Sequence, residues 1–144
     1  MPLHPVHPTP TLHLALRGRG AAAEARQAVR DFLEPFRGGE PPYFPARALD
    51  AALLVISELV TNAVRHATGD CALDLHVVPD GVDVDVTDSS SAEPRARRPD
   101  ERGEGGWGWH LVNLLGTDVE IHHHDGAEAG KTIHVHIPRG PFVR

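Results

Sequence analysis

The chain has 144 residues, of which 40% are hydrophobic and 24% are charged. These proportions are those of an ordinary globular domain, and the length fits one domain, which excludes a collagen-like or wholly disordered chain. Lysine and arginine total 14 against 20 acidic residues, which gives a formal net charge of −6. This balance argues against a direct nucleic-acid binder, because such a protein needs a basic surface.

The cysteine content and the first residues predict where the protein works. Cys71 is the only cysteine, which excludes an intrachain disulfide and suits a reducing compartment. Residues 1–10 lack the basic and apolar regions of a signal peptide, and no apolar run approaches the roughly 20 residues of a membrane helix. We therefore expect a cytoplasmic protein with no membrane partner, in which a disordered Pro/His-rich tail (1–10) precedes one domain (11–144).

Hydrophobic periodicity predicts interleaved strands and helices. In chain order, the predicted elements are a strand (11–16), a helix (21–36), a long helix (46–67), a hairpin (73–78 and 82–87), a polar loop (89–106), a helix (109–115) and a second hairpin (118–124 and 132–138). The expected fold class is α+β, a two-layer α/β sandwich with helices on one face of a mixed, mostly antiparallel sheet.

Three polar residues of the long helix are candidates for chemistry. Glu58, Asn62 and His66 are four residues apart and share a helix face, away from the apolar stripe. An amide oxygen is a ligand that suits Mg²⁺, and a carboxylate can orient or deprotonate an attacking hydroxyl. By spacing alone, a solvent-exposed helix face without function is the alternative.

The end of the second predicted strand carries another candidate, Asp88. It continues the alternation of Val82, Val84 and Val86, so it should point toward the helix-covered face, where a carboxylate is costly unless it is paired. There it could accept a hydrogen bond from the exocyclic amine of a purine. A turn-forming or helix-capping aspartate is the alternative.

Four glycines precede the predicted helix 109–115: Gly103, Gly105, Gly106 and Gly108. Glycines allow backbone amides to approach a phosphate closely, and a helix N-terminus attracts anions. A flexible lid is the alternative interpretation.

In this order and spacing, these segments resemble the Bergerat-fold, or histidine kinase-like, ATPases, and most of all the small anti-sigma factor serine kinases. ELVTNAVRHA (58–67) is similar to the N box of that superfamily. Residues 82–90 and GEGGWGWHLV (103–112) are similar to its two glycine boxes, and GKTIHVHIP (130–138) to its closing strand. The resemblance covers residues 21–138, which is nearly the whole chain.

The resemblance implies ATP and Mg²⁺ as cofactors and a Bergerat ATP-binding fold, with residues 89–108 as the ATP lid. It implies that Glu58 is the catalytic base and that Asn62 binds the metal. The other cofactor-binding positions that it implies are His66, Asp88, Gly103, Gly105, Gly106, Gly108 and Thr132.

The first glycine box differs from the family pattern, and strand alternation conflicts with the role implied for Thr132. Ser89, Ser90 and Ser91 follow Asp88 where the family carries a glycine, and serine narrows the space beside a base. Thr132 alternates with His134 and His136, so it should face away from the pocket unless a β-bulge intervenes.

The implied function is an ATP-dependent serine/threonine kinase that phosphorylates an anti-anti-sigma antagonist protein, sequesters a sigma factor, or does both. The family often forms homodimers. One alternative is a nucleotide-gated binding module without kinase activity. Another is a metal-binding or pH-sensing regulator, because four histidines share strand faces in pairs: His122 and His124, and His134 and His136.

Overall fold

A computed structural model describes residues 9–38, 43–66, 69–90, 108–125 and 130–140. Within these residues the elements are, in order, β1 (Thr11–Arg17), α1 (Ala21–Arg37), α2 (Ala46–His66), β2 (Asp70–Val78), β3 (Gly81–Asp88), α3 (Gly108–Leu115), β4 (Thr117–His124) and β5 (Gly130–Pro138). Every predicted helix and strand is present, and each of their boundaries lies within three residues of its expected position.

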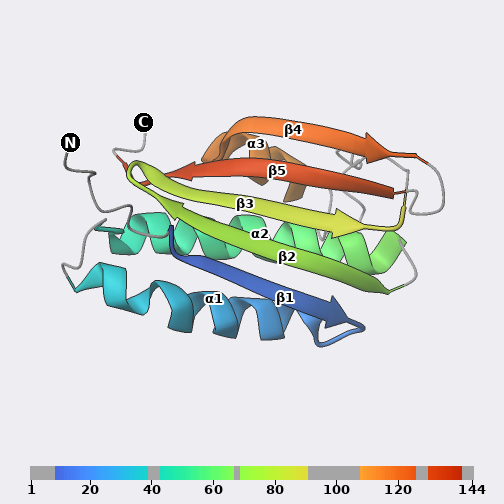
Figure 1. Ribbon diagram of the computed structural model, residues 1–144, viewed down its shortest axis with the longest axis horizontal. Helices are drawn as coiled ribbons and strands as arrows, with labels where there is room; N and C mark the ends of the chain where they lie inside the picture. Colours follow the sequence, from blue (N-terminus) through green and yellow to red (C-terminus); the bar gives the residue numbers. More distant parts are fainter. Residues whose placement is uncertain (1–8, 39–42, 67–68, 91–107, 126–129, 141–144) are drawn as a thin grey trace, which may run out of the picture.

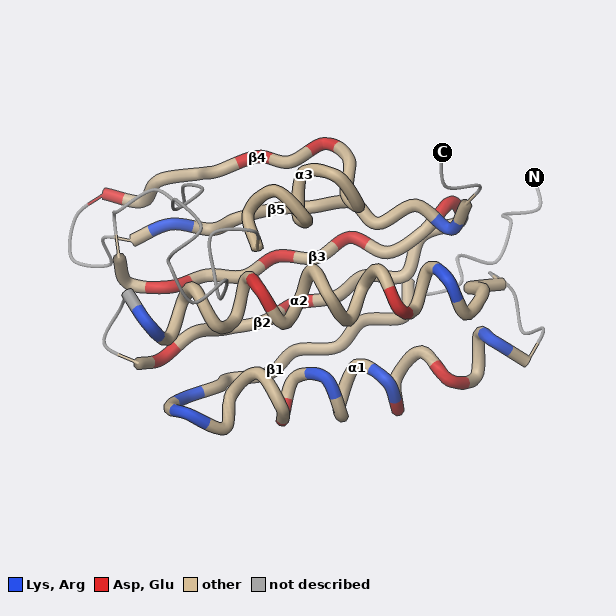
Figure 2. The backbone as a smooth tube through the Cα atoms, turned by 180° about the vertical axis from the view of Figure 1, so that it is seen from behind, with Lys and Arg blue, Asp and Glu red and all other residues tan. Residues whose placement is uncertain are grey.

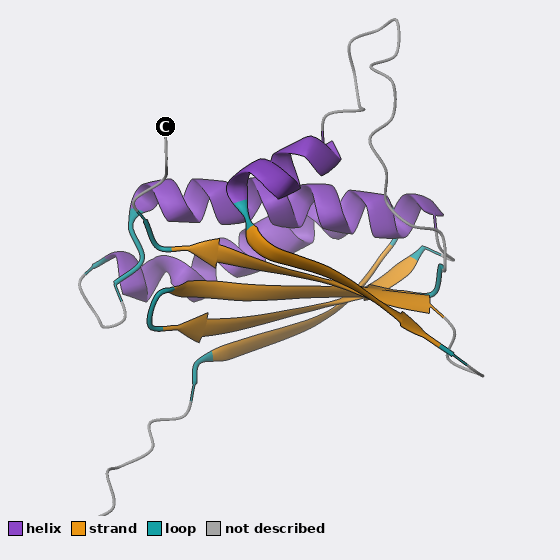
Figure 3. Cartoon of the chain, turned by 90° about the horizontal axis from the view of Figure 1, so that it is seen from above, coloured by secondary structure: helices purple, strands orange, loops and turns teal. Residues whose placement is uncertain are grey.

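The five strands form one sheet in the order β1-β2-β3-β5-β4. Each neighbouring pair of described strands is antiparallel. The three helices cover one face of this sheet, and no described helix covers the other face (Figures 1 and 3). The predicted α+β two-layer architecture is therefore confirmed.

Strict alternation in the strands builds the core. The valines of β3 (Val82, Val84, Val86) are buried, and so are their partners in β5, which are Ile133, Val135 and Ile137. Fully burying such a side chain contributes about 1.5–3 kcal/mol. This inner face of the sheet therefore fixes the pairing register, because a slip by one residue would turn every one of these side chains to solvent.

The long helix α2 lies between α1 and α3 on the inner face of the sheet, as Figure 2 shows. Its residues Ile56, Val60 and Ala63 are buried against the strands, and Leu53 is partly buried. This stripe agrees with the predicted one. The rotation of α2 about its axis is thereby set, and Glu58 and Asn62 are left half-buried outside the stripe.

Two further expectations concern the tail over residues 1–10 and the lack of a membrane-spanning helix. Of the predicted tail, residues 1–8 lie outside the described part, and the Pro10 carbonyl accepts a hydrogen bond of 2.9 Å from the Val77 N–H. Among the described helices, none combines the length and the apolar character needed to cross a membrane.

The packing of α2 predicts very different costs for two substitutions two residues apart. Ile56→Ala should lower the free energy of unfolding by about 2–5 kcal/mol, because Ile56 is fully buried and its truncation leaves a cavity. Leu54→Ala is the matched control, because 48% of Leu54 is exposed, and it should cost less than about 1 kcal/mol. Urea unfolding followed by circular dichroism measures both, and equal losses would contradict the described orientation of α2.

Candidate functional site

Glu58 and Asn62 lie one turn apart on α2, and Glu58 lies beside the first residue of α3. The contact is shown by Gly108, where a Cβ atom would lie 2.0 Å from Oε2 of Glu58 and 2.7 Å from its Cδ. The absence of a side chain at Gly108 therefore lets the Glu58 carboxylate reach the N-terminus of α3. Glu58 and Gly108, which are 50 positions apart in the sequence, are brought together as the resemblance implies.

This arrangement combines groups of complementary chemistry. The N-terminus of a helix carries unpaired N–H groups and a partial positive charge, which attract anions such as phosphate. A carboxylate and an amide one helical turn apart supply oxygen atoms of the kind that Mg²⁺ prefers. The α2–α3 contact can therefore serve the polyphosphate end of a nucleotide and its metal ion.

Asp88 is the last residue of β3, and it points to the inner face as predicted. Asp88 is 7% exposed, and both of its carboxylate oxygens lie 3.0 Å from Nζ of Lys131. The Ser90 N–H also donates to Oδ1 at 2.8 Å. The carboxylate is thus paired, as its burial requires, because removal of one partner of such a pair costs about 3–5 kcal/mol.

The close approach of β5 to β3 makes this pair possible. Lys131 is opposite Asp88 in the strand register, and a Cβ atom at Gly130 would lie 2.1 Å from the Asp88 carbonyl oxygen. Sequence reasoning did not identify Lys131 or Gly130 as site residues. Strand alternation could have identified Lys131, because it lies two residues before Ile133 and therefore faces inward, as Ile133, Val135 and Ile137 do.

Cys71 is opposite Asp88 on the neighbouring strand β2 and is also buried. Burial, and to a lesser extent the nearby carboxylates of Asp88 and Asp70, raise the pKa of the Cys71 thiol to about 11. The thiol is therefore protonated at neutral pH, which excludes a role as a nucleophile there.

The structure places Thr132 on the outer face of the sheet. Its hydroxyl lies 2.8 Å from the Thr87 hydroxyl and 2.7 Å from Nε2 of His124. No bulge interrupts the β3–β5 register between Gly81 and Asp88, so alternation holds and Thr132 faces away from Asp88. The assignment of Thr132 to the inner pocket is therefore not supported by its position.

Several predicted site residues fall outside the described part of the chain. Gly103, Gly105 and Gly106 are among residues 91–107, together with most of the predicted lid. His66 is the last residue of α2, and its side chain is outside the described part as well. Their roles stay predictions.

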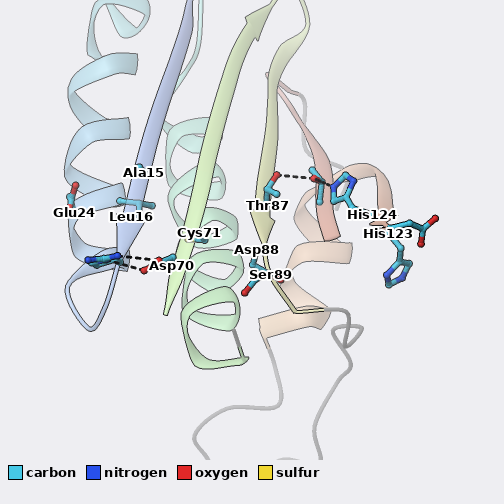
Figure 4. Close-up of a pocket in the computed structure, with 13 residues that line it drawn as sticks. Ala15, Leu16, Glu24, Asp70, Cys71, Thr87, Asp88, Ser89, His123 and His124 are labelled. Carbon is cyan, nitrogen blue, oxygen red and sulfur yellow. Dashed lines mark hydrogen bonds and ion pairs between the residues drawn. The ribbon is translucent and has the colours of Figure 1, made fainter. Parts of the chain in front are cut away.

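A hollow of about 1250 Å³ opens at the sheet end where β3 finishes and β2 begins. Asp88, Ser89 and Cys71 line it from the strand ends, together with Thr87 and His124 (Figure 4). Glu58 and Asn62 are not among its lining residues. Asp88 and Thr132 are the candidate site residues that line this space, and Gly108 is not among its lining residues either.

The histidine strands do not assemble a metal centre among the described residues. His134 and His136 lie 2.9 Å and 2.7 Å from carboxylate oxygens of Asp85 and Asp83 on the next strand. His122 is opposite Thr132 and pairs with Glu120 at 3.0 Å. Within the described ranges, no group of three or more His, Cys, Asp or Glu side chains is arranged to hold a metal ion.

Comparison with known proteins identifies the family of the chain. The profile of the family described as "Histidine kinase-like ATPase domain" matches residues 19–137, so the chain belongs to that family. It is thus an ATPase domain of the histidine kinase-like class.

Two individual proteins refine the comparison. The chain is 28% identical over 109 residues to the serine-protein kinase RsbW of Listeria innocua, and the match covers 64% of this chain and 69% of that one. It is also similar to the crystal structure of the RsbU and RsbW domains of Rv1364c from Mycobacterium tuberculosis, with a TM-score of 0.64 and 25% identity. That match covers 91% of this chain, which spans only 33% of the solved chain.

Substitution by alanine should affect stability differently at Gly108, the first residue of α3, and at Gly116, which directly follows α3. Gly108→Ala meets only the mobile end of Glu58, and alanine favours helix, so the free energy of unfolding should change by less than about 1 kcal/mol. In the matched variant Gly116→Ala, the new Cβ would lie 2.2 Å from Cγ1 of buried Val135 and 3.0 Å from the Val112 carbonyl oxygen, which should cost about 1–3 kcal/mol. Denaturant unfolding measures both. A larger loss for Gly108→Ala than for Gly116→Ala would contradict the expectation that the Glu58 side chain can move away from the new Cβ atom.

The raised pKa of Cys71 predicts a slow thiol. With a pKa of about 11, about one thiol in a thousand is ionised at pH 8, against about one in ten at the ordinary thiol pKa of 9.0. Reaction of the folded protein with a disulfide reagent should therefore be at least about 100-fold slower than reaction of the unfolded chain. The folded rate should keep rising with pH beyond 9, and since Cys71 is the only cysteine, a plateau near pH 9 would count against its burial.

Proposed function

We propose that the chain is an ATP-dependent protein serine kinase, which transfers the γ-phosphate of ATP to a serine of an antagonist protein. The observation that carries the proposal is the contact between the Glu58 carboxylate and Gly108 at the N-terminus of α3. Asn62, one turn further along α2, completes the polar group on this side of the helix.

The reaction requires positioning and one proton acceptor. The serine hydroxyl oxygen forms a bond to the γ-phosphorus, the bond between that phosphorus and the bridging oxygen breaks, and ADP leaves. Glu58 accepts the hydroxyl proton or orients the hydroxyl, since a carboxylate within reach can do either. Such transfers depend mainly on alignment and on neutralisation of charge, which the N–H groups of α3 support.

The residues also fit the magnesium ion that the family uses. Asn62 would hold the ion through its amide oxygen, and the ion would supply neutralisation of the phosphate charge. Asp88, buried at the end of β3, is the proposed acceptor for the exocyclic amine of adenine. His66, Gly103, Gly105 and Gly106 belong to the proposed site on the grounds of their place in the family motifs.

The proposed partners follow from the anti-sigma kinase type. One is an anti-anti-sigma protein that provides the serine, and the other is a sigma factor that the domain holds inactive. A homodimer and a cytoplasmic location complete the proposal. The similarity to the serine-protein kinase RsbW supports the kinase class.

Two substitutions should separate binding from chemistry. Asn62→Ala removes the proposed metal ligand and should weaken Mg-ATP binding at least about tenfold, as measured by calorimetric titration. Glu58→Gln keeps the shape of the side chain and should leave affinity within about threefold, while phosphate release from ATP, with water as acceptor, falls at least about 100-fold.

The matched control is Asn113→Ala, because Asn113 is an exposed amide on α3 that donates to the Trp109 carbonyl. It should leave both measurements unchanged. Saturable ATP binding without any hydrolysis or phosphotransfer would replace the kinase by a nucleotide-gated binding module. Absence of ATP binding at millimolar concentration would refute both.

A further inference from the structure

Lys131 is a charged residue on the inner, helix-covered face of the sheet. It is 4% exposed and shares its face with the apolar residues Ile133 and Val135. Its Nζ lies 3.0 Å from each carboxylate oxygen of Asp88 and 3.1 Å from the Ser90 carbonyl oxygen. Because an ammonium group has three N–H donors, these three acceptors engage all of them.

This ion pair bears directly on the recognition of a base. Asp88 is the residue proposed to accept the exocyclic amine of adenine, and its carboxylate already accepts from Lys131 and from the Ser90 N–H. An incoming amine presents N–H hydrogens with partial positive charge next to the ammonium. Both the repulsion and the competition for the same oxygens weaken the binding of a purine with a 6-amino group.

A purine with a carbonyl group at the same position meets the opposite situation. Its oxygen is an acceptor, and an ammonium donates strongly to such an atom. Lys131 can therefore turn one N–H from the Ser90 carbonyl to the base and keep its contact with Asp88. The Asp88–Lys131 pair therefore disfavours a purine with a 6-amino group and accepts a purine with a 6-oxo group.

We propose that Lys131 is a specificity-determining residue of the nucleotide site, which lowers the affinity for adenine nucleotides relative to 6-oxo purine nucleotides. The inference rests on the proposed function, because it takes Asp88 as part of the base pocket. It adds that the identity of residue 131 decides which purine that pocket prefers.

The test is a calorimetric titration of ATP and of inosine triphosphate, each with Mg²⁺, into the full chain and its variants. Lys131→Met removes the charge and keeps the length, so the affinity for ATP should rise about tenfold, while the affinity for inosine triphosphate stays equal or falls. The ratio of the two dissociation constants is the readout, because a general loosening of the fold would move both constants together. Lys131→Arg keeps the charge and is the matched control, for which the ratio should stay within about threefold of the wild type.

Lys131→Met leaves Asp88 buried without its partner, so the double variant Asp88→Asn/Lys131→Met is measured beside it. The asparagine amide that replaces the Asp88 carboxylate offers both an acceptor and a donor. The ratio of the two dissociation constants should therefore again change in favour of ATP, by about threefold or more. A ratio unchanged in both variants, with binding intact, would overturn the role of Lys131 alone. Failure of either nucleotide to bind any of these proteins at millimolar concentration would overturn this inference and the proposed function together.

Discussion

The packing of α2 against the inner face of the sheet is the constraint on which the rest of the structure depends. Ile56, Val60 and Ala63 are buried there, and each large apolar side chain contributes about 1.5–3 kcal/mol when it leaves water. A turn of the helix by one residue, about 100°, would expose these side chains and bury Glu58 in their place. The apolar stripe therefore aims the polar face of α2 at α3, and the position of the Glu58 carboxylate is a consequence of core packing.

The sequence could predict those parts of the fold and site that depend on local patterns. The spacing of apolar residues predicted α2, and alternation through Val82 and Val86 predicted that Asp88 faces inward, both of which are confirmed. The partner of Asp88 could not be predicted in the same way. Lys131 reaches it only because β5 pairs with β3 inside the sheet, and this strand order is set by tertiary packing rather than by any local signal. The role implied for Thr132 came from resemblance alone, and the regular register turns its side chain to the other face.

The two faces of the sheet satisfy their polar groups by different means. The inner face is apolar except at its end, where the Asp88–Lys131 pair is closed off from water. The outer face carries alternating imidazoles and carboxylates, and pairs such as His134–Asp85 and His136–Asp83 join neighbouring strands. Opposite partners across antiparallel strands contribute about 0.2–1 kcal/mol each. His134 and His136, which the sequence offers as metal ligands, thus pair with carboxylates of the next strand. These polar pairs allow the outer face of the sheet to be exposed to water.

The strand order also determines when the Asp88–Lys131 ion pair forms during folding. The β2–β3 hairpin closes through a turn at Pro79 and Asp80, and such hairpins form within about 1–10 μs. Asp88 and Lys131 are 43 positions apart, so their contact requires the closure of a long loop, which is slow because chain entropy is lost before any contact is gained. Until β5 docks, Asp88 ends an exposed hairpin and keeps its hydration. Dehydration of this ion pair and completion of the sheet are therefore one kinetic event, and a chain that stalls before it has a sheet edge on β3 open to aggregation.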